Sequence, residues 1–129
     1  MDSTQKQLCA QAVELIERDF PMLAGVDDLA DRLAVSKCHL IRCFSSQMGI
    51  SPGKYLTGIR LAAVQEHLTQ SDHNLDTIAG LTGFACGNYL CKVFRKAFGI
   101  SPMDYRQQHR GSLGDSAQLR RRSEDISFV

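Results

Sequence analysis

The feature that most constrains this chain is an internal repeat, in which the stretch from Leu29 to Tyr55 returns in recognisable form from Ile78 to Tyr105. Matched positions lie 49 residues apart at the start and 50 apart from Leu40 onward, so the second copy has one extra residue before Leu90. The matches are Leu29-Ala30 with Ile78-Ala79, Leu40 with Leu90, Phe44 with Phe94, Gly49-Ile50-Ser51-Pro52 with Gly99-Ile100-Ser101-Pro102, and Tyr55 with Tyr105. Such a chain contains two versions of one structural unit.

Length and composition favour an intracellular protein that is stable without disulfides or a structural metal. The 129 residues suffice for one ordinary domain, or for two small ones that share an element. No apolar run approaches the roughly 20 residues of a membrane span, and no signal peptide follows Met1. The five cysteines form no CxxC pair, so we expect ordinary thiols rather than disulfides or a metal site. We predict a cytoplasmic protein with no membrane partner.

Charge is unevenly distributed, although the net charge is only +1. Residues 1–28 contain two basic and six acidic residues, whereas residues 29–110 contain ten basic and five acidic ones. The repeated part is therefore the basic part of the chain. A concentrated positive charge is typical of proteins that bind nucleic acid.

Apolar spacing and capping residues predict an all-α protein of seven helices. We expect helices over about Thr4–Phe20, Val26–Ala34, Ser36–Gly49 (Ser36 as cap, Gly49 as stop), Pro52–Thr69, Leu75–Leu81, Gly87–Phe98 and Ser101–Gln108. The predicted segments are a first subdomain over 1–51, a linker helix over 52–70, a second subdomain over 71–110 and a disordered tail over 111–129, which has no apolar period.

Each copy has the pattern of a helix-turn-helix motif, in which small residues let a short helix approach the next one closely. Ala30 and Ala34 have this role in the first copy, and Ala79 and Gly83 in the second. In the first copy, the inward face is predicted to hold Leu40, Phe44 and Met48 or Gln47, and the outward face Cys38, Arg42 and Ser45. In the second copy, Leu90 and Phe94 are predicted to face inward, and Asn88, Cys91, Lys92 and Arg95 outward. Arg, Lys and Asn are side chains that hydrogen-bond base edges in the major groove. A solvated basic face is the alternative for a single copy.

A wider pattern within and around the repeat consists of Leu29-Ala30, Leu40, Phe44, Gly49-Ile50-Ser51-Pro52, Tyr55, Arg60-Leu61, Ile78-Ala79, Gly83-Phe84, Tyr89-Leu90, Val93-Phe94-Arg95-Lys96, Phe98-Gly99, Ser101-Pro102 and Tyr105-Arg106. Through these residues, the chain from about Leu8 to Arg110 resembles the arabinose-regulator (AraC/XylS) family of transcription factors. It implies a homeodomain-like fold of two helix-turn-helix subdomains joined by a long linker helix. It also implies two recognition helices that enter successive major-groove segments about 34 Å apart.

The resemblance carries site residues onto this chain by position. The implied base-reading residues are Cys38, Ile41, Arg42, Gly87, Asn88 and Lys92, and we expect Lys37, Lys54, Arg95 and Lys96 to hold phosphates. Cys38 and Ile41 are smaller or less polar than the family's usual residues, so the first helix is expected to depend mainly on Arg42. Ile41 is alternatively a rim residue of the core. Gly87 indicates either close approach to DNA or tolerance of glycine at a helix start.

The resemblance implies a sequence-specific regulator, most often an activator, with double-stranded DNA and RNA polymerase as partners. We expect a monomer on DNA, without a small-molecule site or cofactor. The chain resembles either stand-alone regulators of the MarA/SoxS type, which its initial methionine favours, or the DNA-binding end of a longer sensor or repair protein. A redox switch through Cys38 or Cys91 is left open. Cys38-His39 lacks the flanking Pro and Arg of alkylation-repair methyltransferases, so no catalytic residue is expected.

Overall fold

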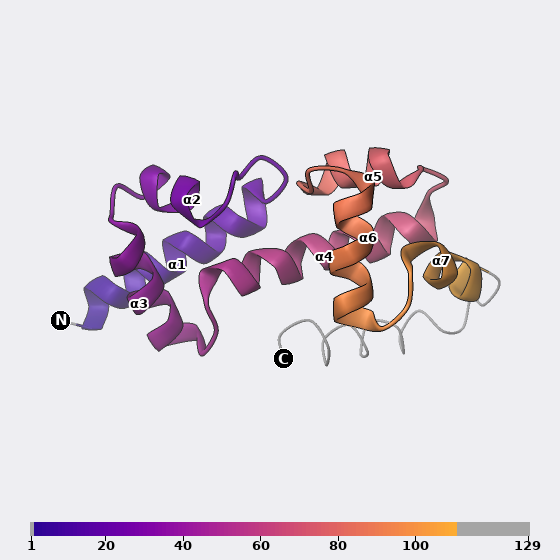
Figure 1. The fold of residues 1–129 in the computed structure, drawn as a ribbon. Coiled ribbons are helices and arrows are strands. Elements are labelled where there is room, and N and C mark those ends of the chain that lie inside the picture. Colours follow the sequence, from indigo (N-terminus) through magenta and orange to yellow (C-terminus); the bar gives the residue numbers. More distant parts are fainter. Residues whose placement is uncertain (1, 111–129) are drawn as a thin grey trace. The chain divides into compact units, whose positions relative to one another are not determined.

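The computed structural model describes residues 2–110, and over this range it has seven helices and no strand (Figure 1). The helices are α1 (Asp2–Asp19), α2 (Val26–Arg32), α3 (Lys37–Met48), α4 (Pro52–Gln70), α5 (Leu75–Thr82), α6 (Gly87–Phe98) and α7 (Pro102–Arg110). The predicted all-α fold is confirmed, and each helix end lies within two residues of its predicted position. The tail predicted over 111–129 lies outside the described residues.

The described chain forms two compact units that meet within α4, between Ile59 and Arg60. Unit 1 contains α1, α2, α3 and the first part of α4, whereas unit 2 contains the rest of α4 with α5, α6 and α7. None of the helices in residues 2–110 is long and apolar enough to cross a membrane.

The core of unit 1 is formed where α1, α2 and α3 pack together. Its buried residues are Cys9, Ala12, Leu15, Ile16, Leu23, Leu29, Ala30, Leu40, Phe44 and Leu56. Tyr55 closes this core from α4: its ring lies 5.6 Å from that of Phe44, and its hydroxyl donates a hydrogen bond to Glu17 Oε2 at 2.7 Å. Burial, together with this carboxylate, raises the pKa of Tyr55 to about 12.

Unit 2 repeats this arrangement with its own residues. Its buried core holds Leu61, Val64, Leu68, Ile78, Ala79, Phe84, Leu90, Phe94 and Tyr105. The ring of Tyr105 lies 5.4 Å from Phe94, and the Tyr105 hydroxyl accepts a hydrogen bond from Gln65 Nε2 at 3.2 Å. Gln65 thus hydrogen-bonds the Tyr105 hydroxyl as Glu17 hydrogen-bonds the Tyr55 hydroxyl in unit 1. The structural repeat therefore also includes α1 and the second part of α4.

The turn between the short helix and the recognition helix shows where the extra residue of the second copy lies. Val35 N donates to Ala30 O in unit 1, and Phe84 N donates to Ala79 O in unit 2, both 49 residues further on. The next residues that correspond, Ser36 and Cys86, precede the recognition helices and are 50 apart. The insertion is therefore Ala85, at the end of the turn.

The two turns differ in how they reach a left-handed backbone. Gly83 has φ 94°, which costs glycine little because it has no Cβ. At the corresponding position, Ala34 has φ 59° and is the one non-glycine residue with positive φ in residues 2–110. An L-residue in this region is strained by roughly 1–2 kcal/mol. The sequence prediction of close helix approach holds at both turns, but at Ala34 the approach strains the backbone.

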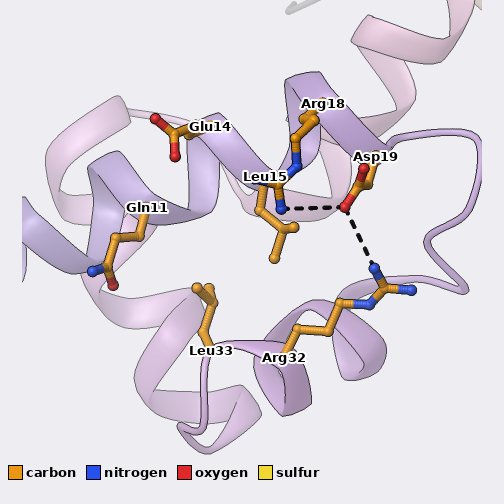
Figure 2. A pocket seen from close by; sticks show the side chains of 7 residues that line it. All are labelled: Gln11, Glu14, Leu15, Arg18, Asp19, Arg32 and Leu33. Carbon is orange, nitrogen blue, oxygen red and sulfur yellow. Dashed lines mark hydrogen bonds and ion pairs between the residues drawn. The ribbon is translucent and has the colours of Figure 1, made fainter.

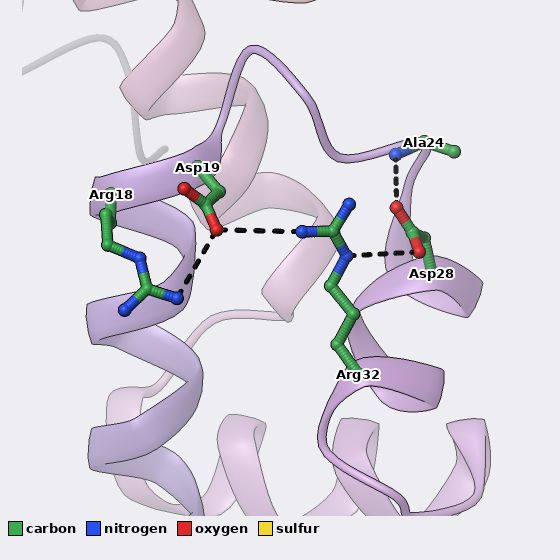
Figure 3. Close-up of polar contacts among 5 residues, drawn as sticks. All are labelled: Arg18, Asp19, Ala24, Asp28 and Arg32. Atoms are coloured by element: carbon green, nitrogen blue, oxygen red, sulfur yellow. Dashed lines mark hydrogen bonds and ion pairs between the residues drawn. The ribbon is translucent and has the colours of Figure 1, made fainter.

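Four charged side chains, Arg18, Asp19, Asp28 and Arg32, link α1 to α2 in unit 1 (Figure 3). Arg32 contacts Asp28 at 3.3 Å and Asp19 at 3.6 Å, and Asp19 also contacts Arg18 at 3.3 Å. Asp28 accepts a hydrogen bond from Ala24 N at 3.0 Å. This backbone hydrogen bond, with that from Arg32, lowers the pKa of Asp28. The contacts fix the loop that leads into α2.

Two predicted apolar faces are wrong in part. On α3 the third buried residue is Cys43, whereas Gln47 and Met48 are exposed, because the helix has moved away from the core by its last turn. On α4, the helical spacing of Tyr55, Leu56, Ile59, Ala63 and Leu68 in the sequence predicts one apolar stripe. The helix instead supplies Leu56 to the first core and Leu61, Val64 and Leu68 to the second.

Candidate nucleic-acid interface

The exposed face of α3 carries the residues that the first copy was predicted to present. Ser36 begins the helix, its hydroxyl accepting a hydrogen bond from His39 N at 3.1 Å. With Leu40, Cys43 and Phe44 buried, the side chains of Cys38, Ile41 and Arg42 are all exposed. Ile41 is 37% exposed, so its side chain meets solvent. Arg42 is the one cation among these three candidate base readers.

The exposed face of α6 is richer in hydrogen-bonding side chains. Leu90 and Phe94 are buried in the core of unit 2, while Asn88 and Lys92, four residues apart on one face, are exposed. Arg95 and Lys96 are also exposed in the last turn, where the helix dipole favours positive charge. An amide and three cations on one helix suit both base edges and phosphates.

Gly87 is the one predicted base-reading residue that is buried, and the structure gives a packing reason for its glycine. Gly87 N donates a hydrogen bond to Asp76 Oδ1 at 3.0 Å, which ties the start of α6 to the first turn of α5. A Cβ at Gly87 would lie 2.7 Å from that same oxygen and 3.3 Å from Leu75 C. The close approach is therefore to α5, an alternative to the two explanations that the sequence suggested.

In unit 1, the positions that match Asp76 and Gly87 are linked by an ion pair between side chains. Asp27 and Lys37 correspond to Asp76 and Gly87, and Lys37 Nζ lies 3.4 Å from Asp27 Oδ1. Both side chains are more than half exposed, so the ion pair contributes little stability and Lys37 can exchange its partner for a phosphate. The predicted phosphate-binding role of Lys37 thus competes with Asp27.

Lys54, the remaining predicted phosphate contact, lies in the first turn of α4. Its backbone N–H donates to Ser51 Oγ at 3.2 Å, and its side chain is exposed. In unit 2 the corresponding residue is Asp104, whose N–H donates to Ser101 Oγ at 3.1 Å. The first turns of α4 and α7 thus share a serine cap but differ in charge at this position. Lys54 of α4 offers a cation to a phosphate, whereas Asp104 of α7 does not.

Sequence reasoning missed two residues of unit 2 that the structure brings to the start of α6. Asp76 holds the backbone of Gly87, as described above. Tyr89 is 51% exposed beside Asn88. Tyr89 was noted only as a matched aromatic residue. Tyr89 lies three residues before Lys92, and residues three apart on a helix share a face, so the sequence could have indicated that the Tyr89 ring is exposed.

The thiols and a pocket of unit 1 add no further candidate site within the described residues. Cys38 and Cys86 are exposed, Cys91 is half-buried, and Cys9 and Cys43 are buried; no cluster of metal-ligating side chains exists within residues 2–110. A pocket of about 430 Å³ lies between α1 and α2 (Figure 2), with Leu15, Leu33, Arg18 and Arg32 among its lining. Asp19 contacts both arginines, so their charge is already compensated.

Comparison with known proteins identifies the family of this two-unit helical chain. A family model described as a helix-turn-helix domain matches residues 29–108. A solved regulator from Chromobacterium violaceum, described as AraC-type, superposes with a TM-score of 0.72 at 28% identity, covering 87% of this chain and 99% of that one. The chain belongs to the AraC-type helix-turn-helix family. This family consists of DNA-binding transcription regulators and is not a class of enzymes.

Two further AraC-type proteins are informative. The solved DNA-binding domain of AdpA, a global transcriptional factor in complex with a target DNA, has a TM-score of 0.74 and 31% identity, covering 80% of this chain and 93% of that one. The transcriptional activator RhaS of Yersinia pestis is 32% identical over 98 residues, which are 76% of this chain. The chain spans only 36% of the length of RhaS.

Proposed function

We propose that this chain binds a specific double-stranded DNA sequence through α3 and α6 and activates transcription. The observation that carries the proposal is the exposed face of α6, where Asn88 and Lys92 are followed by the exposed cations Arg95 and Lys96 in the last turn of the same helix. The similar AdpA domain was solved with a target DNA, which supports a DNA ligand. The activating role is supported by similarity to RhaS, and we propose RNA polymerase as the protein partner.

The two helices are proposed to contribute unequally. Asn88 and Lys92 on α6 can each make two hydrogen bonds to a base edge, whereas on α3 only Arg42 can do so, beside the small thiol of Cys38 and the apolar Ile41. The first half of the recognition site should therefore tolerate more base changes than the second. One chain supplies both helices, so we propose that it binds as a monomer, in the cytoplasm with the nucleoid.

In-vitro selection from a random duplex library tests this function directly. We expect enrichment of one sequence with two half-elements about 10 base pairs apart, one helical turn of DNA. The half-element with the stronger base preference should lose that preference in Lys92→Ala. A library that shows no enrichment over several rounds, or a selected site with one element only, would contradict the two-helix proposal.

A further inference from the structure

The carboxylate of Asp76 lies at the start of the recognition helix α6, although Asp76 belongs to α5. Its Oδ1 atom accepts a hydrogen bond from Gly87 N at 3.0 Å, and a Cβ at Gly87 would lie only 2.7 Å from this oxygen. Cys86, the residue before α6, makes no side-chain capping bond. The acceptor position at the first N–H group of α6 is therefore already filled by an anionic side chain of the same unit.

The start of α6 is a position that would otherwise attract an anion. The N–H groups in the first turn of a helix lack partners within the helix, and the helix dipole places a partial positive charge there. Phosphate groups commonly bind at such helix starts. Asp76 also lies in the first turn of α5, where the side chain of Asn74 accepts a hydrogen bond from Thr77 N at 2.8 Å. One carboxylate thus lies near the positive ends of two helices.

The charge of Asp76 is accessible to a ligand that approaches α6. Asp76 is exposed, as are Asn88 and Lys92, the candidate base readers of this helix. None of the ion pairs within residues 2–110 involves Asp76, so no basic side chain of this range compensates its charge. A phosphate brought to the start of α6 would meet a like charge, and juxtaposed like charges oppose binding.

The corresponding aspartate of unit 1 has a different partner. Asp27 matches Asp76, and its Oδ1 atom lies 3.4 Å from the Nζ atom of Lys37, which matches Gly87. The Lys37 ammonium compensates the carboxylate and is itself a group that binds phosphates, whereas Gly87 has no side chain to do either. The start of α3 therefore offers a cation to a phosphate, and the start of α6 offers an anion.

We propose that Asp76 keeps DNA phosphates away from the start of α6 and so makes this recognition helix selective for base edges. The proposal rests on the DNA-binding function proposed above and adds a specificity-determining residue to it. On random DNA, phosphate contacts supply nearly all of the binding, and an open helix start would add one more. On the selected DNA site, here called the operator, the start of a recognition helix faces base edges, so the Asp76 charge opposes binding less. Asp76 thereby lowers the affinity for random DNA more than the affinity for the operator.

Asp76→Asn tests the charge, because it retains an oxygen that can accept the hydrogen bond from Gly87 N. Fluorescence anisotropy titrations compare the operator with a random duplex of equal length. We expect the random duplex to bind about fivefold more tightly and the operator less than about twofold more tightly, so that selectivity falls. The salt slope on the random duplex should steepen by about one, because one further phosphate is contacted. A gain in affinity cannot result from unfolding.

Asp27→Asn is the matched control, because it removes the same charge at the corresponding position of unit 1. It releases Lys37 to bind a phosphate in either complex, so both duplexes should bind more tightly by the same factor of about two, and selectivity should not change. Asp76→Ala is a second test, since it removes both the charge and the acceptor for Gly87 N. The random duplex should again bind more tightly, whereas the operator should bind about threefold more weakly, because the start of α6 is no longer held by α5.

The outcomes distinguish failure of phosphate exclusion from failure of the proposed function. Unchanged binding by Asp76→Asn, an equal gain on both duplexes, or the same loss of selectivity in Asp27→Asn would overturn the role of Asp76 while DNA binding stands. Weaker binding of both duplexes by Asp76→Asn would also overturn it, and would leave Asp76 as a structural acceptor alone. If the wild-type protein binds neither duplex, the proposed DNA-binding function fails, and the role of Asp76 fails with it.

Discussion

The Asp76 carboxylate accepts a hydrogen bond from the Gly87 backbone N–H at 3.0 Å, so the first turn of α5 holds the first residue of the recognition helix α6. One of the N–H groups that every helix leaves unpaired at its start is thereby satisfied. Cys86, which precedes α6, makes no side-chain capping bond. Asp76 of α5 therefore accepts a hydrogen bond from a backbone N–H at the start of α6, as Ser36 does for the start of its own helix α3.

Gly87→Ala should destabilise unit 2, although alanine normally favours a helix. The added methyl group would lie 2.7 Å from Asp76 Oδ1 and 3.2 Å from Asp76 N, so α5 and α6 must separate. We expect a loss of about 1–3 kcal/mol in the free energy of unfolding, measured by urea denaturation. Gly80→Ala is the control: it lies in α5 with nothing within 4 Å, and should stabilise by about 0.5–1 kcal/mol. Equal effects of the two substitutions would show that the approach to α5 is not tight.

Ala34→Gly should stabilise unit 1 despite the greater freedom of glycine in the unfolded chain. Relief of the strained backbone at φ 59° outweighs that entropy, and we expect a gain of up to about 1 kcal/mol. The reciprocal change, Gly83→Ala at φ 94°, should cost about 1 kcal/mol or more in unit 2. Thermal denaturation of both variants measures whether each substitution raises or lowers the melting temperature. A destabilised Ala34→Gly would mean that the turn is not strained in solution.

Tyr55→Phe should remove about 1 kcal/mol of stability near neutral pH, because it deletes the hydrogen bond to Glu17. The folded state raises the pKa of Tyr55 to about 12 and so favours the neutral phenol. This contribution is complete below the unfolded pKa of about 10 and is lost as the pH rises towards 12. The wild type should therefore lose more stability than Tyr55→Phe between these pH values, as denaturation at several pH values can show. Glu17→Gln should reduce the alkaline loss, since it removes the carboxylate; parallel pH profiles for all three proteins would contradict the assignment.

Arg42→Ala and Lys92→Ala should each reduce discrimination between operator and random DNA by about 1–3 kcal/mol. Lys96→Ala should instead weaken binding to both duplexes alike and flatten its salt dependence, because a phosphate contact carries no base information. Titrations of both duplexes at several salt concentrations separate these classes. Equal losses on both duplexes for Arg42→Ala and Lys92→Ala would remove them from the base-reading set.

Residues that act through local chain geometry were predictable. Gly49 and Gly99 end their helices with φ 78° and 79°, and Ser51 and Ser101 cap the helices that follow, as the repeated sequence predicts. Residues that act across the fold were not. No spacing rule connects Asp76 with Gly87 or Gln65 with Tyr105, because each pair joins two helices through a contact that only packing creates.

The sequence by itself determined the seven helices, the duplication and the outward position of Arg42, Asn88 and Lys92, since apolar period, caps and glycine stops act within a few residues of each other. Only the tertiary structure decided that Gly87 is a packing glycine, that Ala34 carries backbone strain and that α4 supplies two cores. These properties depend on distances between helices, and such distances are set by how side chains from separate segments fit together.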